Sequence, residues 1–332
     1  MKKYLLVFLS VFSAIVVIVL IILFVLAWIF LVPKKNDNFN MKSVTNENLQ
    51  FYFTAELRKG FEGEGKSSIF LCDVVSDTYS LKYSSEKYNI QNFCVDKEII
   101  YFIGEYGEKY DLVKLENDTE INIAEFDIPI YYLKKIDNKL YYAVKEKSKD
   151  NNYIVKGYCY DLIENEIITI FEHKFEYLIN IGNVEFISDS EIYLEGWSET
   201  TQYIAYLISG IEITEINNAQ ILQKYNDILY IYFWYREYQN IFGIYDIKTK
   251  EVIKLKKFND NDFVLKKNLI INKNGKYAII YASRKDLKNS FIDQMQKDYI
   301  TIINMETYKQ AAVRCIDLRE NFYTVYSYAW IE

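Results

Sequence analysis

Apolar and polar residues alternate in short runs along most of this chain. Between Ile221 and Leu255 the sequence reads ILQKYNDILYIYFWYREYQNIFGIYDIKTKEVIKL. Four runs rich in Ile, Leu, Tyr, Phe and Val are separated by the turn-forming pairs Asn226-Asp227, Gln239-Asn240 and Thr249-Lys250. Alternation of apolar and polar residues with a period of two, bounded by turn residues, is typical of β-strands. The stretch therefore predicts one four-stranded antiparallel sheet.

Two landmarks of this unit recur along the chain after residue 45. The first is a turn that leads into an apolar strand, and it starts at Asp96, Asp137, Asp189, Asn226 and Asn274. The second is a later strand that enters another turn, and it is centred on Asp73, Lys114, Asp161, Leu207, Asp246 and Asn304. The second landmark recurs on average every 46 residues or so, which is the repeat length of β-propeller blades. Helical repeats of similar length are excluded by the period-two pattern.

The two ends of the repeat region complement each other. The region begins with LQFYFTAEL, which matches the second strand of a blade, and ends with FYTVYSYAWIE, which matches a first strand. Pairing these two strands would complete one sheet and close the ring, which removes exposed strand edges. Six landmarks with this closure predict an all-β, six-bladed propeller. A seventh blade would need strands within residues 283–298, whose sequence is more typical of a loop with a short helical turn.

The segment IYDIKTKEVIKL contains a strand, the pattern Asp-Ile-x-Thr and a second strand. Its recurring form resembles the blades of TolB-like and WD-repeat-like β-propellers, and the resemblance covers roughly residues 49–332. No blade carries the Gly-His and Trp-Asp pairs of true WD repeats or the double glycine of kelch repeats. The resemblance implies a binding scaffold as often as an enzyme, so it does not select a function.

The N-terminal end predicts a membrane anchor. A short tail, residues 1–3, precedes Tyr4–Val32, a run without a charged residue. This run exceeds the roughly 20 apolar residues that span a bilayer, so it predicts an uncleaved transmembrane helix. A cleaved signal peptide is the alternative, but the run is too long for its apolar core and no A-x-A-like site follows. Residues 33–48 are polar and predict a linker to the propeller at 49–332.

Charge and cysteine content indicate where the protein is located and which partners it can bind. Two lysines flank each end of the apolar run, and the α-amino group adds charge at the start, which favours an extracytoplasmic propeller on a single-pass protein of the cell membrane. The net charge is −7 with both signs interspersed, so nucleic acid is not expected as a partner. Cys72, Cys94, Cys159 and Cys315 lie apart in apolar runs and predict buried thiols, with a Cys72–Cys94 disulfide as the alternative in an exported domain.

The sequence contains no evident catalytic constellation. Its single histidine, His173, has no nucleophile motif to accompany it and is interpreted as an exposed residue near a strand end. Residues 259–262, Asn-Asp-Asn-Asp, lack the glycine and the distal glutamate of a calcium loop and predict a solvated turn. We therefore expect no metal and no cofactor. Among 46 acidic residues, no pair stands out as catalytic.

The connections between second and third strands are the longest, and together they predict a loop-rich binding face. Aromatic residues and arginine, the types enriched in binding hot spots, occur along these connections. The candidate binding residues are Phe61, Trp197, Trp234, Tyr235, Arg236, Tyr238 and Arg284. Individually, Trp197 and Trp234 are also interpretable as core residues at blade ends.

These patterns leave three functions open. The first is a membrane-anchored, non-enzymatic module of the bacterial envelope that engages a protein, peptide or glycan through the loop-rich face. The second is an envelope hydrolase or lyase that acts on carbohydrate or peptide through carboxylates in the propeller funnel. The third is a sensor or assembly subunit that works only within a complex.

Overall fold

The computed structural model describes residues 40–57, 66–150, 152–175, 178–198, 203–210, 212–217, 219–235, 238–257, 263–284, 297–317 and 322–331. The chain divides into two compact units, 1–40 and 41–332, and the described strands all belong to the second. The expected anchor, residues 4–32, lies outside the described residues. Within those described ranges, no helix has the length and the apolar character needed to cross a membrane.

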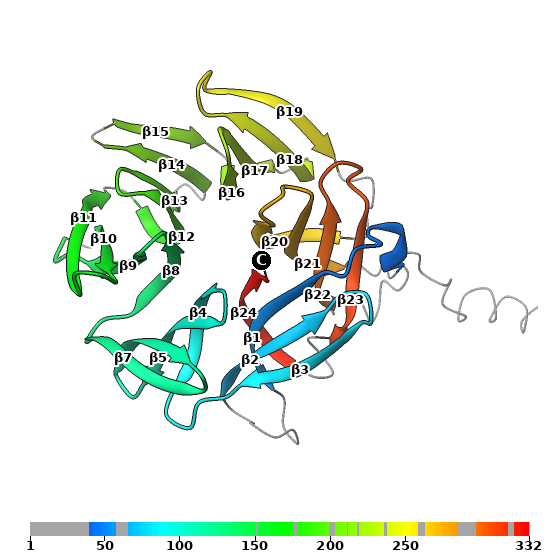
Figure 1. Cartoon of the computed structure of the whole chain (residues 1–332). Coiled ribbons are helices and arrows are strands. Elements are labelled where there is room, and N and C mark those ends of the chain that lie inside the picture. Colours follow the sequence, from blue (N-terminus) through cyan, green and yellow to red (C-terminus); the bar gives the residue numbers. More distant parts are fainter. Residues whose placement is uncertain are drawn as a thin grey trace, which may run out of the picture. The chain divides into compact units, whose positions relative to one another are not determined.

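The described strands of the second unit form six four-stranded antiparallel sheets around a common centre, as Figure 1 shows. Blade 1 consists of β24 (Phe322–Trp330), β1 (Gln50–Leu57), β2 (Ser67–Asp73) and β3 (Thr78–Tyr83). Blade 2 consists of β4 (Asn89–Asp96), β5 (Ile99–Tyr106), β6 (Lys109–Glu116) and β7 (Thr119–Phe126). Blade 3 consists of β8 (Ile130–Ile136), β9 (Lys139–Lys147), β10 (Tyr153–Asp161) and β11 (Glu166–Phe175).

The other three blades repeat this order. Blade 4 consists of β12 (Leu178–Ser188), β13 (Glu191–Ser198), β14 (Tyr203–Ser209) and β15 (Glu212–Asn217). Blade 5 consists of β16 (Ala219–Tyr225), β17 (Ile228–Tyr235), β18 (Tyr238–Asp246) and β19 (Glu251–Lys257). Blade 6 consists of β20 (Phe263–Ile271), β21 (Tyr277–Arg284), β22 (Lys297–Asn304) and β23 (Gln310–Asp317). The six-bladed all-β prediction is confirmed.

The last strand of the chain closes the ring by pairing with the first. Phe51 lies opposite Trp330 and Phe53 lies opposite Tyr328 in the β1–β24 ladder. Thr54 is fully buried, and its hydroxyl lies 2.9 Å from that of Ser327 and 3.1 Å from the carbonyl oxygen of Gln91 in β4. The predicted pairing of the two ends is therefore confirmed, and it also connects blade 1 to blade 2.

An aromatic cluster supports this closure. The rings of Phe53 and Phe70 are stacked with centroids 5.2 Å apart, and Phe322 meets Phe53 edge-on at 5.5 Å. Phe51, Phe53 and Phe322 are fully buried. Burying one such side chain contributes about 1.5–3 kcal/mol, so the cluster stabilises β1, β2 and β24 as one sheet. The same core includes Tyr277 and Ile279 of blade 6, which joins the first and last blades.

The innermost strand of each blade carries a register shift. In blades 2 to 5 the shift lies between Ile90 and Phe93, between Ile130 and Tyr132, between Ile181 and Val184, and between Ile221 and Gln223. Blade 6 has shifts between Leu265 and Ile270, and in blade 1 the β1–β24 ladder shifts at Thr54/Ala55. A bulge bends a strand and redirects its side chains. The same irregularity therefore recurs around the centre of the ring.

A shared turn follows the third strand in four blades. The Oδ1 atom of Asp161 accepts hydrogen bonds from the backbone N–H groups of Ile163 (2.9 Å) and Glu164 (3.2 Å). Asp73, Asp246 and Asn304 cap the equivalent turns in the same way. The fourth residue after each capping residue has a positive φ, for example 56° at Asn165. Asp and Asn suit such turns because their short side chains bond the local backbone.

We expect these capping carboxylates to make the fold sensitive to acid. Hydrogen bonds from the backbone N–H groups of Ser76, Ile163 and Thr249 lower the pKa of Asp73, Asp161 and Asp246, respectively. The ionised caps therefore stabilise the fold above the usual aspartate pKa, and this contribution is lost as the pH falls through the lowered folded-state pKa. In the variant with Asp161 and Asp246 replaced by Asn, the thermal midpoint should fall less steeply between about pH 4 and pH 2. Circular dichroism at each pH measures this midpoint.

Asp127→Asn is the matched control for this pH profile, because Asp127 is exposed and caps no such turn. It should reproduce the acid dependence of the wild type. If the Asp161/Asp246 variant keeps the wild-type acid dependence, the capping carboxylates are not its source.

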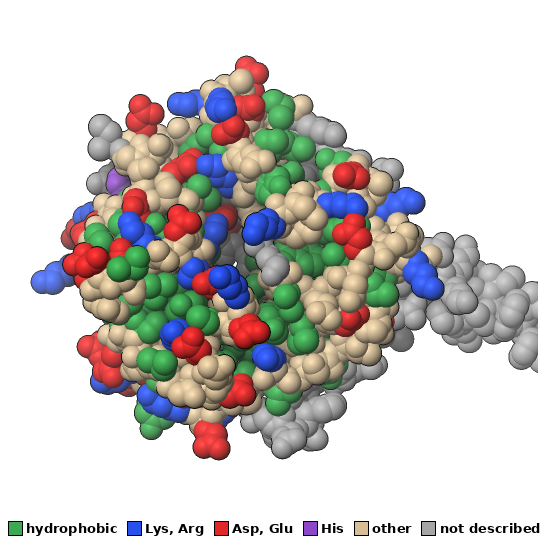
Figure 2. All heavy atoms as spheres, viewed as in Figure 1, with side chains coloured by type: hydrophobic (Ala, Val, Ile, Leu, Met, Phe, Trp, Pro, Cys, Tyr) green, Lys and Arg blue, Asp and Glu red, His purple; other side chains and the backbone are tan. Residues whose placement is uncertain are grey.

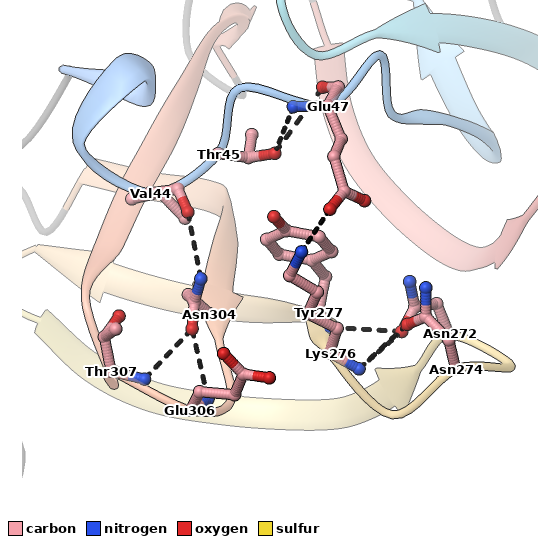
Figure 3. Close-up of polar contacts among 10 residues, drawn as sticks. All are labelled: Val44, Thr45, Glu47, Asn272, Asn274, Lys276, Tyr277, Asn304, Glu306 and Thr307. Atoms are coloured by element: carbon pink, nitrogen blue, oxygen red, sulfur yellow. Dashed lines mark hydrogen bonds and ion pairs between the residues drawn. The ribbon is translucent and has the colours of Figure 1, made fainter.

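The residues before β1 form a strap that packs on blade 6, and we call residues 41–49 the N-terminal strap. It starts with the 3₁₀ turn η2 (Met41–Ser43), and Val44 and Leu49 are buried in the shared core of blades 1 and 6. The carbonyl oxygen of Val44 accepts a hydrogen bond from Asn304 Nδ2 at 3.2 Å, and Glu47 pairs with Lys276 (Figure 3). Most of the strap falls within residues 33–48, expected to be a linker, because the sequence shows no periodicity there.

Asn304 explains why blade 6 uses an amide where blades 1, 3 and 5 use a carboxylate. Its Oδ1 accepts from the N–H groups of Glu306 and Thr307, while its Nδ2 donates to the strap (Figure 3). A carboxylate could accept the two hydrogen bonds of the turn, but it has no N–H group to donate to the strap. The amide therefore serves the turn and the strap together.

We expect Asn304→Asp to loosen the N-terminal strap without unfolding the propeller. Losing one hydrogen bond costs about 1 kcal/mol, so backbone amides of residues 41–49 should exchange roughly fivefold faster in hydrogen–deuterium exchange mass spectrometry. Asp246→Asn, the reverse exchange of carboxylate for amide at the equivalent turn of blade 5, should leave exchange in the strap unaltered. Equal exchange in Asn304→Asp and the wild type would show that this contact does not hold the strap.

Candidate functional site

A pocket with a volume of about 630 Å³ lies at the centre of the ring. Each innermost strand contributes to its wall: residues 92–96 of β4, 131–135 of β8, 184 and 185 of β12, 223 of β16, 269–271 of β20 and 327–330 of β24. Figure 2 shows a hollow at the centre of the ring, with basic and acidic side chains around it. Pockets of about 300–1,000 Å³ are typical of small-molecule sites. We call this cavity the central pocket.

The central pocket occupies one end of the channel. Its lining follows the second half of β4 to Asp96 and of β20 to Ile271, and it continues into the turns at Lys97 and Lys273. Both turn lysines are exposed. These turns join first and second strands, so the pocket extends to the face that carries the short hairpins. The predicted loop-rich face lies at the other ends of the strands.

One side of the pocket is charged. Lys134 Nζ of β8 lies 3.0 Å from Glu185 Oε1 of β12, which connects blades 3 and 4. Lys135 Nζ lies 3.0 Å from Asp96 Oδ2 of β4, which connects blades 3 and 2. Because consecutive residues of a strand point to opposite faces, each lysine reaches a different neighbouring blade. These two pairs leave this wall close to neutral while keeping polar atoms at the pocket surface.

A buried carboxylate lies deeper in the same wall. Glu195 of β13 is only 4 % exposed and lines the pocket next to Leu194. Its carboxylate lies over Gly182, where an added Cβ would stand 2.3 Å from Glu195 Oε1. Gly182 falls within the register shift of β12, so the bulge and the absent side chain together make room for the acid.

The opposite side of the pocket is apolar. Phe93, Leu269, Tyr328 and Trp330 line it and are at most 7 % exposed. Trp330 Nε1 donates a hydrogen bond to the carbonyl oxygen of Ile270 at 2.9 Å, and the Tyr328 hydroxyl accepts one from the N–H of Tyr281 at 3.2 Å. These bonds fix the aromatic wall, since both rings have their polar atoms satisfied. The pocket thus pairs a rigid apolar wall with a charged one.

Among the titratable groups that line the pocket, those with a clearly shifted pKa do not include an activated nucleophile. Burial raises the pKa of the Cys94 thiol to about 12, and a neutral thiol is a poor nucleophile. Burial, with Glu185 as the next contribution, raises the pKa of the Tyr132 hydroxyl well above its usual value. The Cys94 thiol and the Tyr132 hydroxyl are therefore both kept in their neutral forms.

Of the predicted loop-face residues, Trp197 is the one whose side chain the structure describes. Trp197 is half-buried near the end of β13 and does not line the central pocket. Tyr235 and Tyr238 are backbone partners at the end of the β17–β18 ladder, and Arg284 ends β21. The side chains of Trp234, Tyr235, Tyr238 and Arg284 lie outside what the structure describes, as do Phe61 and Arg236 altogether. Binding through this face stays a prediction.

Three further expectations concern possible chemistry. His173 is half-buried rather than exposed, because it lies between the rings of Phe171 and Phe175, with centroids 6.2 Å and 4.6 Å away. Cys94 and Cys159 are free thiols, so the alternative Cys72–Cys94 disulfide is not formed. In the described part of the chain, no group of three His, Cys, Asp or Glu side chains could hold a metal; residues 259–262 fall outside that part.

Sequence reasoning missed the residues of the central pocket. A signal was present, since Lys134-Lys135, Glu185 and Glu195 interrupt otherwise apolar strands. Charged residues in a strand with apolar neighbours either face solvent or line a cavity. The strand pattern does not distinguish these outcomes, because a bulge changes the face on which a side chain emerges.

The fold defines the chain as a six-bladed β-propeller. No protein-family model matches the sequence, and no curated protein matches it. Among solved structures, it is similar to a candidate 6-phosphogluconolactonase from Bacteroides fragilis (11 % identity, TM-score 0.48), covering 90 % of this chain and 100 % of the other. It is also similar to a puromycin hydrolase mutant (8 % identity, TM-score 0.45), covering 82 % of this chain and 54 % of the other.

A third similar structure is the β-propeller domain of the Trilobed protease from Pyrococcus furiosus. It shares 12 % identity and a TM-score of 0.42, covering 71 % of this chain and 73 % of that domain. The activities in these descriptions belong to those proteins. At such identities the likeness concerns the fold, and fold does not determine function.

Proposed function

We propose that this chain is a membrane-anchored binding module that receives a small polar ligand, or the end of a larger one, in its central pocket. The observation that carries this proposal is the cavity of about 630 Å³ whose wall is drawn from all six blades. A wall shared among six sheets is rigid, because moving one lining strand disturbs the packing of its neighbours. Preorganised walls reduce the ordering cost of binding.

The charged and apolar sides support recognition of a ligand with both characters. The pairs Lys134–Glu185 and Lys135–Asp96 offer charged donors and acceptors, while Trp330 and Phe93 offer apolar surface. Protein, peptide and glycan ligands all combine these features.

The apolar segment 4–32 is proposed as the anchor. Retention of the full chain in membranes after alkaline extraction, and release of a chain starting at Met41, would test it.

Filling the central pocket should abolish ligand binding without unfolding the ring. Asn92 lines the pocket at the bulge of β4, so Asn92→Trp places a large ring in the cavity. A panel of peptides and oligosaccharides should raise the thermal midpoint of the detergent-solubilised full chain, and Asn92→Trp should remove every such shift.

Asn122→Trp is the matched control, because Asn122 is an exposed residue of the outermost strand β7. This variant should keep the shifts of the wild type. Ligand shifts that survive in Asn92→Trp would place binding elsewhere, for instance at the predicted loop-rich face.

A second candidate function is that of a hydrolase or lyase that cleaves a glycan or peptide. It is favoured by the three carboxylates that line the pocket, Asp96, Glu185 and Glu195, since glycoside hydrolysis uses a pair of them. If this function holds, the full chain should turn over a member of the panel, and Glu195→Gln should lower the rate at least a hundredfold. Binding without turnover across the panel would favour the binding module.

A further inference from the structure

Bulges of the innermost strands bring uncharged polar side chains into the central pocket. Asn92 and Tyr131 lie within the register shifts of β4 and β8, and Gln223 directly follows that of β16. All three residues line the pocket. A bulge redirects the side chains of its strand, so the same backbone irregularity accounts for all three positions.

These side chains keep polar atoms that the described part of the chain does not use. The Asn92 amide and the Tyr131 hydroxyl make no hydrogen bond to any described residue. Gln223 Oε1 accepts a hydrogen bond from the N–H of Ile271, which leaves the Nε2 group to donate elsewhere. Tyr131 is 42 % exposed, and Asn92 and Gln223 are half-buried. The pocket therefore offers a ligand uncharged hydrogen-bond donors and acceptors from three blades.

The charges of the pocket nearly balance. Four lysines and three carboxylates line it, and Lys134 and Lys135 each lie 3.0 Å from a carboxylate. Opposite charges at that separation largely cancel at longer range. A charged ligand group would lose its water and would find these lysines already paired, which is unfavourable. The pocket therefore favours an uncharged ligand.

A hydroxyl group can join one of these ion pairs without separating it. Lys134 Nζ donates to Glu185 Oε1 at 3.0 Å, and the two side chains are 33 % and 16 % exposed. An ammonium group has three donors and a carboxylate has two acceptor oxygens, so both keep capacity for a ligand. A hydroxyl accepts from the first and donates to the second, whereas a peptide N–H only donates and a peptide C=O only accepts. Neighbouring hydroxyls therefore match this wall better than a peptide backbone does.

The apolar side of the pocket matches the rest of a sugar. A pyranose ring carries hydroxyls around its rim and C–H groups on its faces, so it presents polar and apolar surface together. Phe93, Leu269 and Trp330 provide the apolar wall, and the bond from Trp330 Nε1 to the carbonyl oxygen of Ile270 fixes it. An apolar lining with a few placed polar groups is typical of small-molecule sites.

We propose that the central pocket binds an uncharged sugar unit of a glycan. Its hydroxyls bond to Asn92, Tyr131 and Gln223, and a face of its ring lies on the apolar wall. This inference rests on the proposed pocket-binding function and specifies the class of its ligand.

The test measures binding of maltotriose, cellotriose and chitotriose to the full chain by calorimetry, in a detergent without a sugar headgroup. At least one trisaccharide should bind. Its affinity should change less than about threefold between about 50 mM and about 500 mM NaCl, because no ion pair forms with the ligand. Absence of binding by all three, or a larger loss of affinity with salt, would overturn the proposal. Tetraalanine is titrated in parallel as the peptide probe.

Two near-isosteric variants remove the proposed hydrogen bonds. Asn92→Leu and Tyr131→Phe should each weaken binding of the trisaccharide about fivefold. Asn122→Leu and Tyr106→Phe are the matched controls, because both residues are exposed and lie outside the pocket, and they should bind as the wild type does. Wild-type affinity in both pocket variants would overturn the proposal. If either pocket variant does not fold, the sugar and salt titrations of the wild type still decide the matter.

Failure of this inference can be distinguished from failure of the proposed function. If the wild type binds none of the three sugars, but tetraalanine binds and Asn92→Trp removes that binding, the pocket binds ligands and the sugar assignment is wrong. If no compound gives a thermal shift that Asn92→Trp removes, both proposals are wrong.

Discussion

The pairing of β24 with β1 is the constraint on which the rest of this structure depends. Each blade packs its apolar faces against two neighbours, so an open ring would leave two blade faces and two strand edges exposed to water. The pairing of Phe51 with Trp330 and of Phe53 with Tyr328 brings the ends of the propeller into one sheet. Because β24 is also an innermost strand, the same closure supplies one wall of the central pocket.

The N-terminal strap and the bulges of the innermost strands modify this closed ring at its edge and at its centre. The N-terminal strap is held to blade 6 by the Asn304 amide and by the Lys276 ammonium group, as Figure 3 shows. Lys276 belongs to the same hairpin as Lys273 at the pocket mouth. The strap therefore stabilises a hairpin that borders the pocket. The bulges act at the centre, where they turn innermost-strand side chains into positions that a regular ladder would not allow.

Binding and catalysis make different demands on this pocket. Lys134 and Lys135 are held in ion pairs with Glu185 and Asp96 of the neighbouring blades, which favours fixed recognition of charge over the proton transfer that an acid–base pair requires. The half-buried thiol of Cys94 is kept neutral by its raised pKa.

The sequence by itself determined the strands, most of the turns, the number of blades and the closure, since all of these follow from period-two alternation and turn-forming residues that act locally. The aspartates at 73, 161 and 246 were recognisable as turn positions for the same reason. The pair Gln239-Asn240, predicted as a turn, lies instead inside β18 (Tyr238–Asp246). Only the tertiary structure decided which charges share a cavity. Lys134, Glu185 and Asp96 come from three different blades, and Glu195 reaches the pocket wall beside a bulge at Gly182. A bulge inserts one residue and reverses the face of those beyond it, so alternation cannot locate the pocket.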